Sequence, residues 1–475
     1  MKKRYFLVLW IILILATSCA INPVTGKQEL MFISEQGEIE LGKETDSAVR
    51  SQYGLYDDPV LTEYVKQIGT ALVPYTHRPH LTYHFAVLDS PVINAFAAPG
   101  GYIYVTRGLL SMMNSEAELA VVLGHELGHV NARHSVKKLS QLMLVQIGFA
   151  VGSVISETFA DISGVASVGM QLLFLKFSRD DERQADNLGI YYTRSGGYDP
   201  GKMVNFFNAL QKMGDLSGKH SLPGFLSTHP LTGERIKNTQ ALILSTDSQL
   251  KVSPSVYLNS INNIVYGEDP RQGYVENDRF YHPILRFSFS IPPEWKVQNT
   301  PAQVTLISKD GNAGVILRAE KSSDKLSQYA QKQTADSQGW RLINEQSLYI
   351  NGLTSFQQLF EISQEDTDNL KARISYIRKG SYIYNFISLS SAPNFQKYDY
   401  QFGTLIGSFN ELRNPKYLNR KPSRIKLFRA NGRQTLRNIF QRAGMKEDLW
   451  EKFAIQNEME LGAVPPQNVL IKVVQ

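Results

Sequence analysis

The sequence has a single cysteine, a small net charge and no long hydrophobic run. One cysteine in 475 residues excludes a disulfide bond within the chain, so oxidation does not stabilise the fold. The formal net charge is +6. Three of these charges belong to Lys2, Lys3 and Arg4, in a segment that we expect to be removed, which leaves about +3. The interleaved aromatic and basic residues of a nucleic-acid platform are also missing, so we expect no nucleic-acid partner.

Both apolar stretches are too short, or only just long enough, to span a membrane. Residues 5–16 follow three cations and are typical of a secretion signal. Cys19 lies at the end of this segment, as in a bacterial lipoprotein, which predicts a signal peptide at 1–18 and a lipid on Cys19. An ordinary cleavable signal is the alternative. For residues 142–177 we expect paired helices that cover a cleft or touch a membrane surface, or else ordinary core helices.

The motif His125-Glu126-Leu127-Gly128-His129 is the main functional signal. Two histidines four residues apart lie on the same face of a helix, so their rings can bind one metal ion. Glu126 then lies beside the metal and can take a proton from a bound water molecule. This pattern predicts a zinc hydrolase. The alternative is a buried helix whose histidines are incidental.

The surrounding residues predict a buried helix. Ser115 and Glu118 have the spacing of a capping box at the helix start. Residues 119–123 are continuously apolar, which is typical of a helix buried on most sides. Gly124 and Gly128 leave room for the close approach of another backbone.

A catalytic zinc site needs a third protein ligand and leaves one position for water. Glu182 is the best candidate, and Asp186 lies on the same helix face, four residues later. Glu182 can bind the metal while Asp186 holds one of the histidines by a hydrogen bond. The alternative is a solvated, acidic start of a helix.

At this point the sequence resembles the gluzincin peptidases of family M forty-eight. That family includes the CAAX prenyl proteases, the HtpX-type membrane proteases and the periplasmic lipoproteins that act as chaperone and protease, and this chain most resembles the last type. The resemblance covers roughly residues 20–245. Five segments carry it, in the same order: 22–27 with 34–42, 94–97 with 100–105, the 125–129 motif, Glu182 to Asp186, and 227–230 with 234–235.

The resemblance implies one Zn²⁺ per chain and roles for two further residues. His229 corresponds to a family histidine near the zinc, which either stabilises the oxyanion or occupies the fourth zinc position at rest. The alternative for His229 is an ordinary loop histidine. Arg235 corresponds to a family arginine near the site, and its alternative is a surface charge at the start of a helix.

A segment before the zinc motif is expected to border the substrate. Asn94, Ala95 and Phe96 lead through Gly101 into an alternating strand at 102–106. Backbone groups here could pair with an extended substrate by strand addition. The alternative is an ordinary hairpin of the core sheet.

The rest of the chain predicts two further domains. Within residues 281–412, strands are expected at 287–291, 304–308, 313–319, 354–362, 372–379 and 382–388, with a helix at 327–337. Residues 423–475 have a strand, two helices and a strand, which resembles a LysM-like module, although the usual Gly-Asp-Thr-Leu start is missing and Pro465-Pro466 stands where a Pro-Gly is usual. Arg413 to Arg442 contains ten cations and no acid, typical of either an anion-binding surface or a solvated face.

The complete prediction is an α+β protein of the bacterial cell envelope. A mainly helical zincin-type domain with a small cleft-edge sheet spans 19–250, a linker spans 251–280, and an α+β accessory domain and a LysM-like module follow. The resemblance implies a zinc metalloendopeptidase in the periplasm, anchored to the outer membrane by lipid. Its expected substrates are misfolded or misassembled envelope proteins, with peptidoglycan as a further partner. The alternative is a non-catalytic chaperone or scaffold that uses the same cleft.

Overall fold

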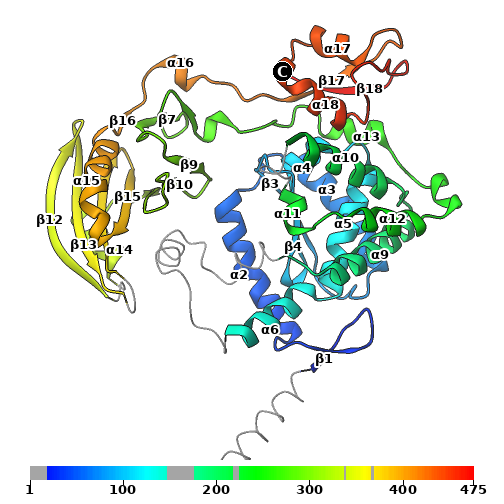
Figure 1. Ribbon diagram of the computed structural model, residues 1–475, viewed down its shortest axis with the longest axis horizontal. Helices are drawn as coiled ribbons and strands as arrows, with labels where there is room; N and C mark the ends of the chain where they lie inside the picture. Colours follow the sequence, from blue (N-terminus) through cyan, green and yellow to red (C-terminus); the bar gives the residue numbers. More distant parts are fainter. Residues whose placement is uncertain (1–18, 147–175, 218–223, 336–338, 365–367) are drawn as a thin grey trace, which may run out of the picture.

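The computed structural model describes residues 19–146, 176–217, 224–335, 339–364 and 368–475. It is a mixed α and β structure, as expected, with a helical domain, a sheet domain beside it and a small terminal domain that lies against the first (Figure 1). The expected signal peptide and most of the 142–177 stretch lie outside the described residues. Among the helices that are described, none combines the length and apolar character needed to cross a membrane.

The helical domain contains most of the helices and two small sheets. Its elements are β1 (Cys19–Ile21), β2 (Gln28–Leu30), α2 (Glu35–Tyr53), α3 (Pro59–Leu72), η1 (Val73–Tyr75), β3 (His84–Leu88), β4 (Ala95–Ala98), η2 (Pro99–Gly101), β5 (Tyr102–Thr106), α4 (Arg107–Met112), α5 (Glu116–Asn131), α6 (His134–Gln146), α9 (Arg179–Ser195), α10 (Lys202–Ser217), α11 (Gly224–Thr228), α12 (Gly233–Ala241) and η3 (Ser245–Gln249). The larger sheet has the order β3-β5-β4. Strand β5 pairs in parallel with β3 and in antiparallel with β4.

Helix α5 forms where the sequence predicts it, and all its residues are buried. The Ser115 hydroxyl accepts the backbone N–H of Glu118 at 3.2 Å, so the expected cap is present. The Glu118 carboxylate accepts the N–H of Asn114 at 2.8 Å, one residue before the expected partner. Both bonds satisfy backbone donors that the first turn would otherwise leave unpaired.

Glycines let helices α5 and α9 lie with their backbones in contact. A Cβ atom on Gly124 would lie 2.9 Å from the carbonyl oxygen of Gly189, and one on Gly128 would lie 3.0 Å from that of Ala185. On the α9 side, a Cβ atom on Gly189 would lie 2.9 Å from the backbone nitrogen of His125. Larger side chains at these glycines would separate the helices, so the expected role of Gly124 and Gly128 is confirmed.

The sheet domain has an antiparallel sheet with a helix on each face. The seven strands lie in the order β12-β13-β14-β15-β11-β10-β9, and a smaller sheet has the order β16-β8-β7-β6. Val315 and Leu317 of β11 pack with α15, whereas Ile316 faces the cluster that contains α14, as the two-residue period of a strand requires. The elements are β6 (Tyr274–Glu276), β7 (Arg279–His282), β8 (Phe287–Ser290), β9 (Lys296–Asn299), β10 (Val304–Ile307), β11 (Ala313–Lys321), α14 (Leu326–Thr334), β12 (Trp340–Ile350), β13 (Leu353–Ile362), β14 (Leu370–Lys379), β15 (Tyr382–Ser391), α15 (Ala392–Gly407) and β16 (Asn410–Glu411).

The expected strands and the expected helix of this domain are present, with small differences at their ends. The long strand β12, the helix α15 and the short strands β6, β7, β9 and β16 were not expected. Most side chains of β12 are exposed on both faces of the strand, so its sequence carries no alternation of polar and apolar residues.

Residues 251–280 are not an irregular linker, which corrects the prediction. They contain α13 (Pro254–Ser260) and η4 (Pro270–Gln272), and their end enters the small sheet. Tyr257, Ile261 and Ile264 are at most 2% exposed and belong to the core of the helical domain. Polar residues surround these apolar ones in the sequence, which concealed the helical spacing.

The terminal domain docks on the helical domain and shares its core. Its elements are β17 (Ile425–Arg429), α17 (Leu436–Arg442), η5 (Glu447–Leu449), α18 (Trp450–Gln456) and β18 (Leu470–Val474). This is the expected strand-helix-helix-strand order, but the order alone does not establish a LysM-like fold, which stays a prediction. Ile425, Phe453 and Val473 lie in one apolar cluster with residues of α3, α5 and α13.

A buried lysine joins the two domains. The side chain of Lys472 is fully buried, and its ammonium donates to the carbonyl oxygens of Ser111, Met112 and Met113 at 3.1, 2.9 and 2.9 Å. These carbonyls lie at the end of α4, where a helix leaves acceptors unpaired. One side chain of β18 therefore satisfies three buried acceptors in the helical domain.

Replacing this lysine should destabilise the contact between the domains. Lys472→Met keeps the volume of the side chain but leaves three buried carbonyls without their donor, so the free energy of unfolding should fall by about 2 kcal/mol or more. Urea denaturation of the full chain measures this change. The exposed Lys421 provides the control, and Lys421→Met should change stability by less than about 0.5 kcal/mol. Equal stability of the two variants would contradict the role of Lys472.

Candidate metal centre

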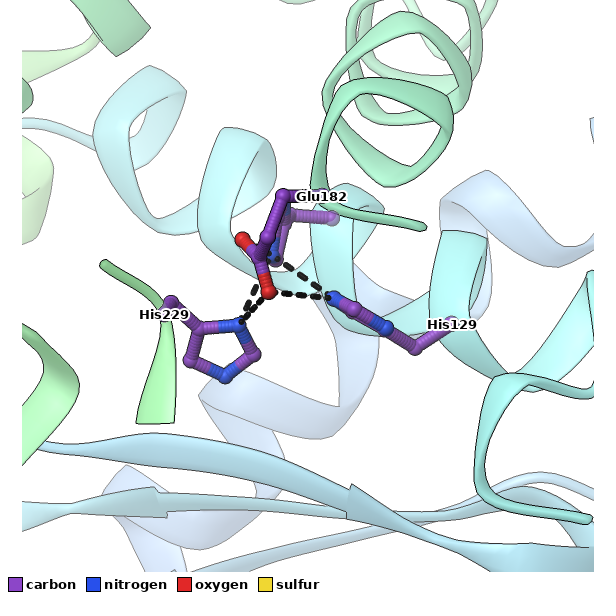
Figure 2. A group of neighbouring side chains, drawn as sticks. His129, Glu182 and His229 are labelled. Atoms are coloured by element: carbon purple, nitrogen blue, oxygen red, sulfur yellow. Dashed lines mark hydrogen bonds and ion pairs between the residues drawn. The ribbon is translucent and has the colours of Figure 1, made fainter. Parts of the chain in front are cut away.

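Four side chains from three segments converge on one buried point. His125 and His129 come from α5, Glu182 comes from the first turn of α9, and His229 follows α11. Each offers one donor atom, and these atoms all lie within 4.8 Å of one another. Figure 2 shows how His129, Glu182 and His229 point toward a common centre. All four side chains are at most 2% exposed.

The donor set fits a zinc ion. His129 Nε2 lies 3.1 Å from His125 Nε2, which lies 3.3 Å from His229 Nδ1. Glu182 Oε1 lies 2.9 Å from His229 Nδ1 and 3.6 Å from His129 Nε2. Two ligands at about 2.1 Å from a tetrahedral zinc are about 3.4 Å apart, so these separations match such a site. Among the described residues, this is the one group that could hold a metal ion.

Asp186 and Arg235 contact the ligands on the sides that face away from the metal position. Asp186 Oδ1 lies 3.0 Å from His125 Nδ1, which leaves the Nε2 of His125 free to bind metal. The Arg235 guanidinium donates to both carboxylate oxygens of Asp186, at 2.7 and 2.8 Å, and lies 2.9 Å from Glu182 Oε2. It also donates to the carbonyl oxygen of Pro230 at 3.1 Å. Arg235 is therefore buried beside the site, and the alternative of a surface charge is wrong.

His129 has partners that were not predicted from the sequence. His134 Nδ1 lies 2.9 Å from His129 Nδ1, and His134 Nε2 lies 2.9 Å from Gln184 Oε1. Because an amide oxygen only accepts, His134 must donate through Nε2 and accept at Nδ1. His129 then carries its proton on Nδ1, and its Nε2 lone pair faces the other ligands. A histidine five residues after the motif was the available signal, but the turn that brings it back was not predictable.

Burial sets the protonation of the central groups. Burial, with the nearby His125 and His134, lowers the pKa of His129 well below its usual value, which favours the neutral form that binds metal. Burial opposes ionisation of Glu182, but His229 and the other nearby cations outweigh it and lower the pKa of this carboxyl. Burial raises the pKa of Glu126, and His229 and His125 oppose the rise.

Glu126 lies beside the donor set and is not part of it. Its Oε1 is buried and has no hydrogen-bond partner among the described residues, and it lies 3.7 Å from His229 Nε2. The backbone N–H of Ala97 in β4 hydrogen-bonds to the Glu126 carboxylate. The raised pKa and the unpaired oxygen suit a group that accepts a proton from a water molecule.

The expected substrate segment is divided between an edge strand and a turn. Ala95 and Phe96 lie in β4, which pairs only with β5 in the described part of the chain, and Asn94 precedes it. Strand β5 is central, so the strand at 102–106 cannot take a further strand, which corrects that expectation. Gly101 lies in η2 with φ 98°, where a Cβ atom would lie 2.7 Å from the carbonyl oxygen of Thr82. Within the expected segment, strand addition is therefore open to β4 and not to β5.

Comparison with known proteins agrees with this geometry. Residues 59–243 match Peptidase family M48. This segment is a peptidase domain of that family. The chain is similar to the beta-barrel assembly-enhancing protease of Yersinia pestis, at 30% identity over 49% of this chain and 48% of the relative. The corresponding protein of Escherichia coli (strain K12) is 28% identical over 47% of each chain.

The domain also occurs in a mitochondrial relative. The mitochondrial metalloendopeptidase OMA1 of Arabidopsis thaliana is 32% identical over 41% of this chain and 38% of its own length. The chain thus spans about half the length, or less, of these curated relatives. A solved structure of cyanobacterial PsbP from Synechocystis sp. PCC 6803 is similar at 14% identity, over 28% of this chain and 91% of that one, with a TM-score of 0.25, too low to support an argument.

Loss of a ligand should remove zinc in a graded way. His129→Ala and Glu182→Ala each delete a donor, so the zinc affinity of the purified protein should fall by more than ~100-fold. Asp186→Asn keeps every donor but weakens the hold on His125, so its loss should be about 10–100-fold. Competition with a chromogenic chelator measures all three. Full zinc occupancy in His129→Ala under this competition would reject the assignment.

Proposed function

We propose that this protein is a zinc-dependent endopeptidase. The observation that carries the proposal is the buried set of two histidines and a glutamate, with a carboxylate oxygen of Glu126 beside it that accepts no hydrogen bond from the described residues, and an edge strand adjacent. The peptidase domain and the names of the relatives support the same reaction. A non-catalytic chaperone or scaffold is the alternative, but it gives no reason for a glutamate beside a complete donor set.

Each residue of the site then has a defined task. A zinc ion held by His125, His129 and Glu182 would supply a Lewis acid and lower the pKa of a coordinated water molecule to about 7. The Glu126 carboxylate accepts the proton of the attacking water. Strand β4 holds the substrate backbone in an extended conformation through the groups on its open edge. Asp186 and Arg235 keep the ligands oriented while the charge of the site changes.

His229 is proposed to close the site at rest. Its Nδ1 lies within ligand distance of His125 and Glu182, so it can occupy the position that water needs. His229 lies between the end of α11 and Pro230, where a helix does not continue. Catalysis then requires that His229 move away from the metal position.

We also propose a place and a class of substrate. The apolar N-terminal segment and Cys19 support a lipoprotein of the periplasm, anchored in the outer membrane. Relatives named for enhancing β-barrel assembly support misfolded or misassembled envelope proteins as substrates. Such chains expose unpaired strands, which is what an edge strand such as β4 can bind.

Glu126→Gln should abolish cleavage and keep the metal. The amide cannot accept the proton of water, while the ligand set is unchanged, so kcat on unfolded casein should fall by at least ~100-fold. Zinc content measured on the same preparation provides the internal check. Glu118→Gln makes the same replacement on the same helix, two turns away, and should retain cleavage. A metal-loaded Glu126→Gln variant that cleaves casein at the wild-type rate would reject Glu126 as the base.

His229→Ala should keep zinc and raise basal cleavage. Removal of the fourth donor opens the position for water, while three protein ligands remain. Casein cleavage and zinc content are compared with those of His80→Ala, an exposed histidine outside the site. A loss of cleavage of ~100-fold with zinc retained would instead assign His229 to the oxyanion. Metal loss equal to that of His129→Ala would reject both roles.

A further inference from the structure

A second buried cluster of charges lies behind the metal centre. Its centre is Glu38 of α2, which is 1% exposed. The Arg78 guanidinium donates to both oxygens of this carboxylate at 3.0 Å, and Arg133 Nε donates to Oε2 at 2.8 Å. Both arginines are buried as well. Neither the metal centre nor the proposed reaction uses any of these groups directly.

Through Arg133, this cluster is connected to the metal ligand His129. Arg133 lies in the turn between α5 and α6, and its φ of 57° is in the left-handed region that non-glycine residues rarely adopt. The turn sends the chain back toward α5, so that the next residue, His134, contacts His129. The bonds from Arg133 to Glu38 and to the carbonyl oxygen of Ile33, at 2.8 Å each, hold the turn in this conformation.

Through Gly100, the cluster is also connected to the edge strand β4. The backbone N–H of Gly100 donates to Glu38 Oε1 at 3.3 Å. Gly100 lies in η2, the turn that follows β4, and a Cβ atom here would lie 2.9 Å from the Cα atom of Ile39. Helix α2 is therefore in backbone contact with the end of β4. Arg78 adds a bond to the carbonyl oxygen of Val130, at 3.0 Å, in the last turn of α5.

We propose that Glu38 is a positioning residue that fixes the metal ligand His129 and the strand β4 relative to each other. The inference rests on the proposed function, because it assigns β4 to the substrate and His129 to zinc. One carboxylate accepts bonds from the turn that orients His129 and from the turn that ends β4. A shift of α2 would therefore disturb both the metal and the strand that binds substrate.

The first test separates the side chain of Arg133 from its backbone. Arg133→Gly suits a φ of 57°, so the turn can form without strain, but the bond to Glu38 is lost. Zinc affinity should fall about 10–100-fold, as it does when an outer partner of a ligand is removed. Arg133→Lys keeps a cation beside Glu38 and should recover most of this affinity. Chelator competition measures zinc without any need for cleavage.

The second test concerns the strand. Glu38→Gln keeps the shape of the side chain. Its amide has one acceptor oxygen in place of two, so it cannot accept hydrogen bonds from both arginines and from Gly100 as the carboxylate does. With zinc in excess, it should raise the KM for unfolded casein several-fold, because the strand that holds the substrate shifts. Under the same conditions Arg133→Gly should have nearly the wild-type KM, because excess zinc fills its weakened site and the bond from Glu38 to Gly100 is kept.

A matched control removes a buried arginine elsewhere. Arg107 is 1% exposed and binds Asp89 at 2.6 Å, away from the metal centre. Arg107→Gln should lower thermal stability but leave zinc affinity and KM unchanged. If Arg133→Gly and Glu38→Gln behave like this control, the cluster is only structural and the inference is wrong. If Glu38→Gln does not fold, the zinc affinity of Arg133→Gly tests the inference alone, and an unchanged affinity would contradict it. A wild-type protein without zinc or cleavage would instead refute the proposed function.

Discussion

The candidate site depends on the backbone contact between α5 and α9. Glu182 is far from the two histidines in the sequence, and it reaches them because three glycines let the helices touch. A methyl group at Gly124, Gly128 or Gly189 would have to push the carboxylate away from the rings, since a packed helix pair has no free volume to absorb it. The ligand geometry is therefore set by residues that carry no side chain.

Around this contact, the charges of the site are arranged in pairs. Asp186 faces both His125 and Arg235, and Arg235 in turn faces Glu182, so each carboxylate in this layer has a cation or a ring nitrogen as its partner. A buried charge without such a partner would be strongly unfavourable. Glu126 differs in its partner: among the described residues its Oε1 accepts no hydrogen bond, and no arginine faces it, whereas Arg235 lies 2.9 Å from Glu182 Oε2. A buried carboxylate oxygen without a donor is available to a water molecule or a substrate.

The sequence predicted the parts of the protein that depend on local patterns. The spacing of His125 and His129 fixes their common helix face, and alternation of apolar residues located strands such as β13 and β15. Features that depend on distant partners were missed or misjudged. His134 orients His129 only because Arg133 adopts a left-handed turn, and nothing local requires that turn. Likewise, α13 was hidden because its apolar residues are few and are buried by a domain that the chain forms about 170 residues later. Which strand lies at the sheet edge is a matter of topology, so β4 and β5 could not be distinguished from their sequences.

The shared core of the first and last domains has a consequence for the order of folding. Residues 425–474 share one apolar core with residues of α3, α5 and α13, and the whole sheet domain lies between them in the sequence. Contacts of such long sequence separation form late, because their loop must close first. The apolar core around the helix that carries the histidines is therefore completed only when residues 425–474 dock on the helical domain. A chain cut before these residues would keep the motif and lose part of the core that surrounds it.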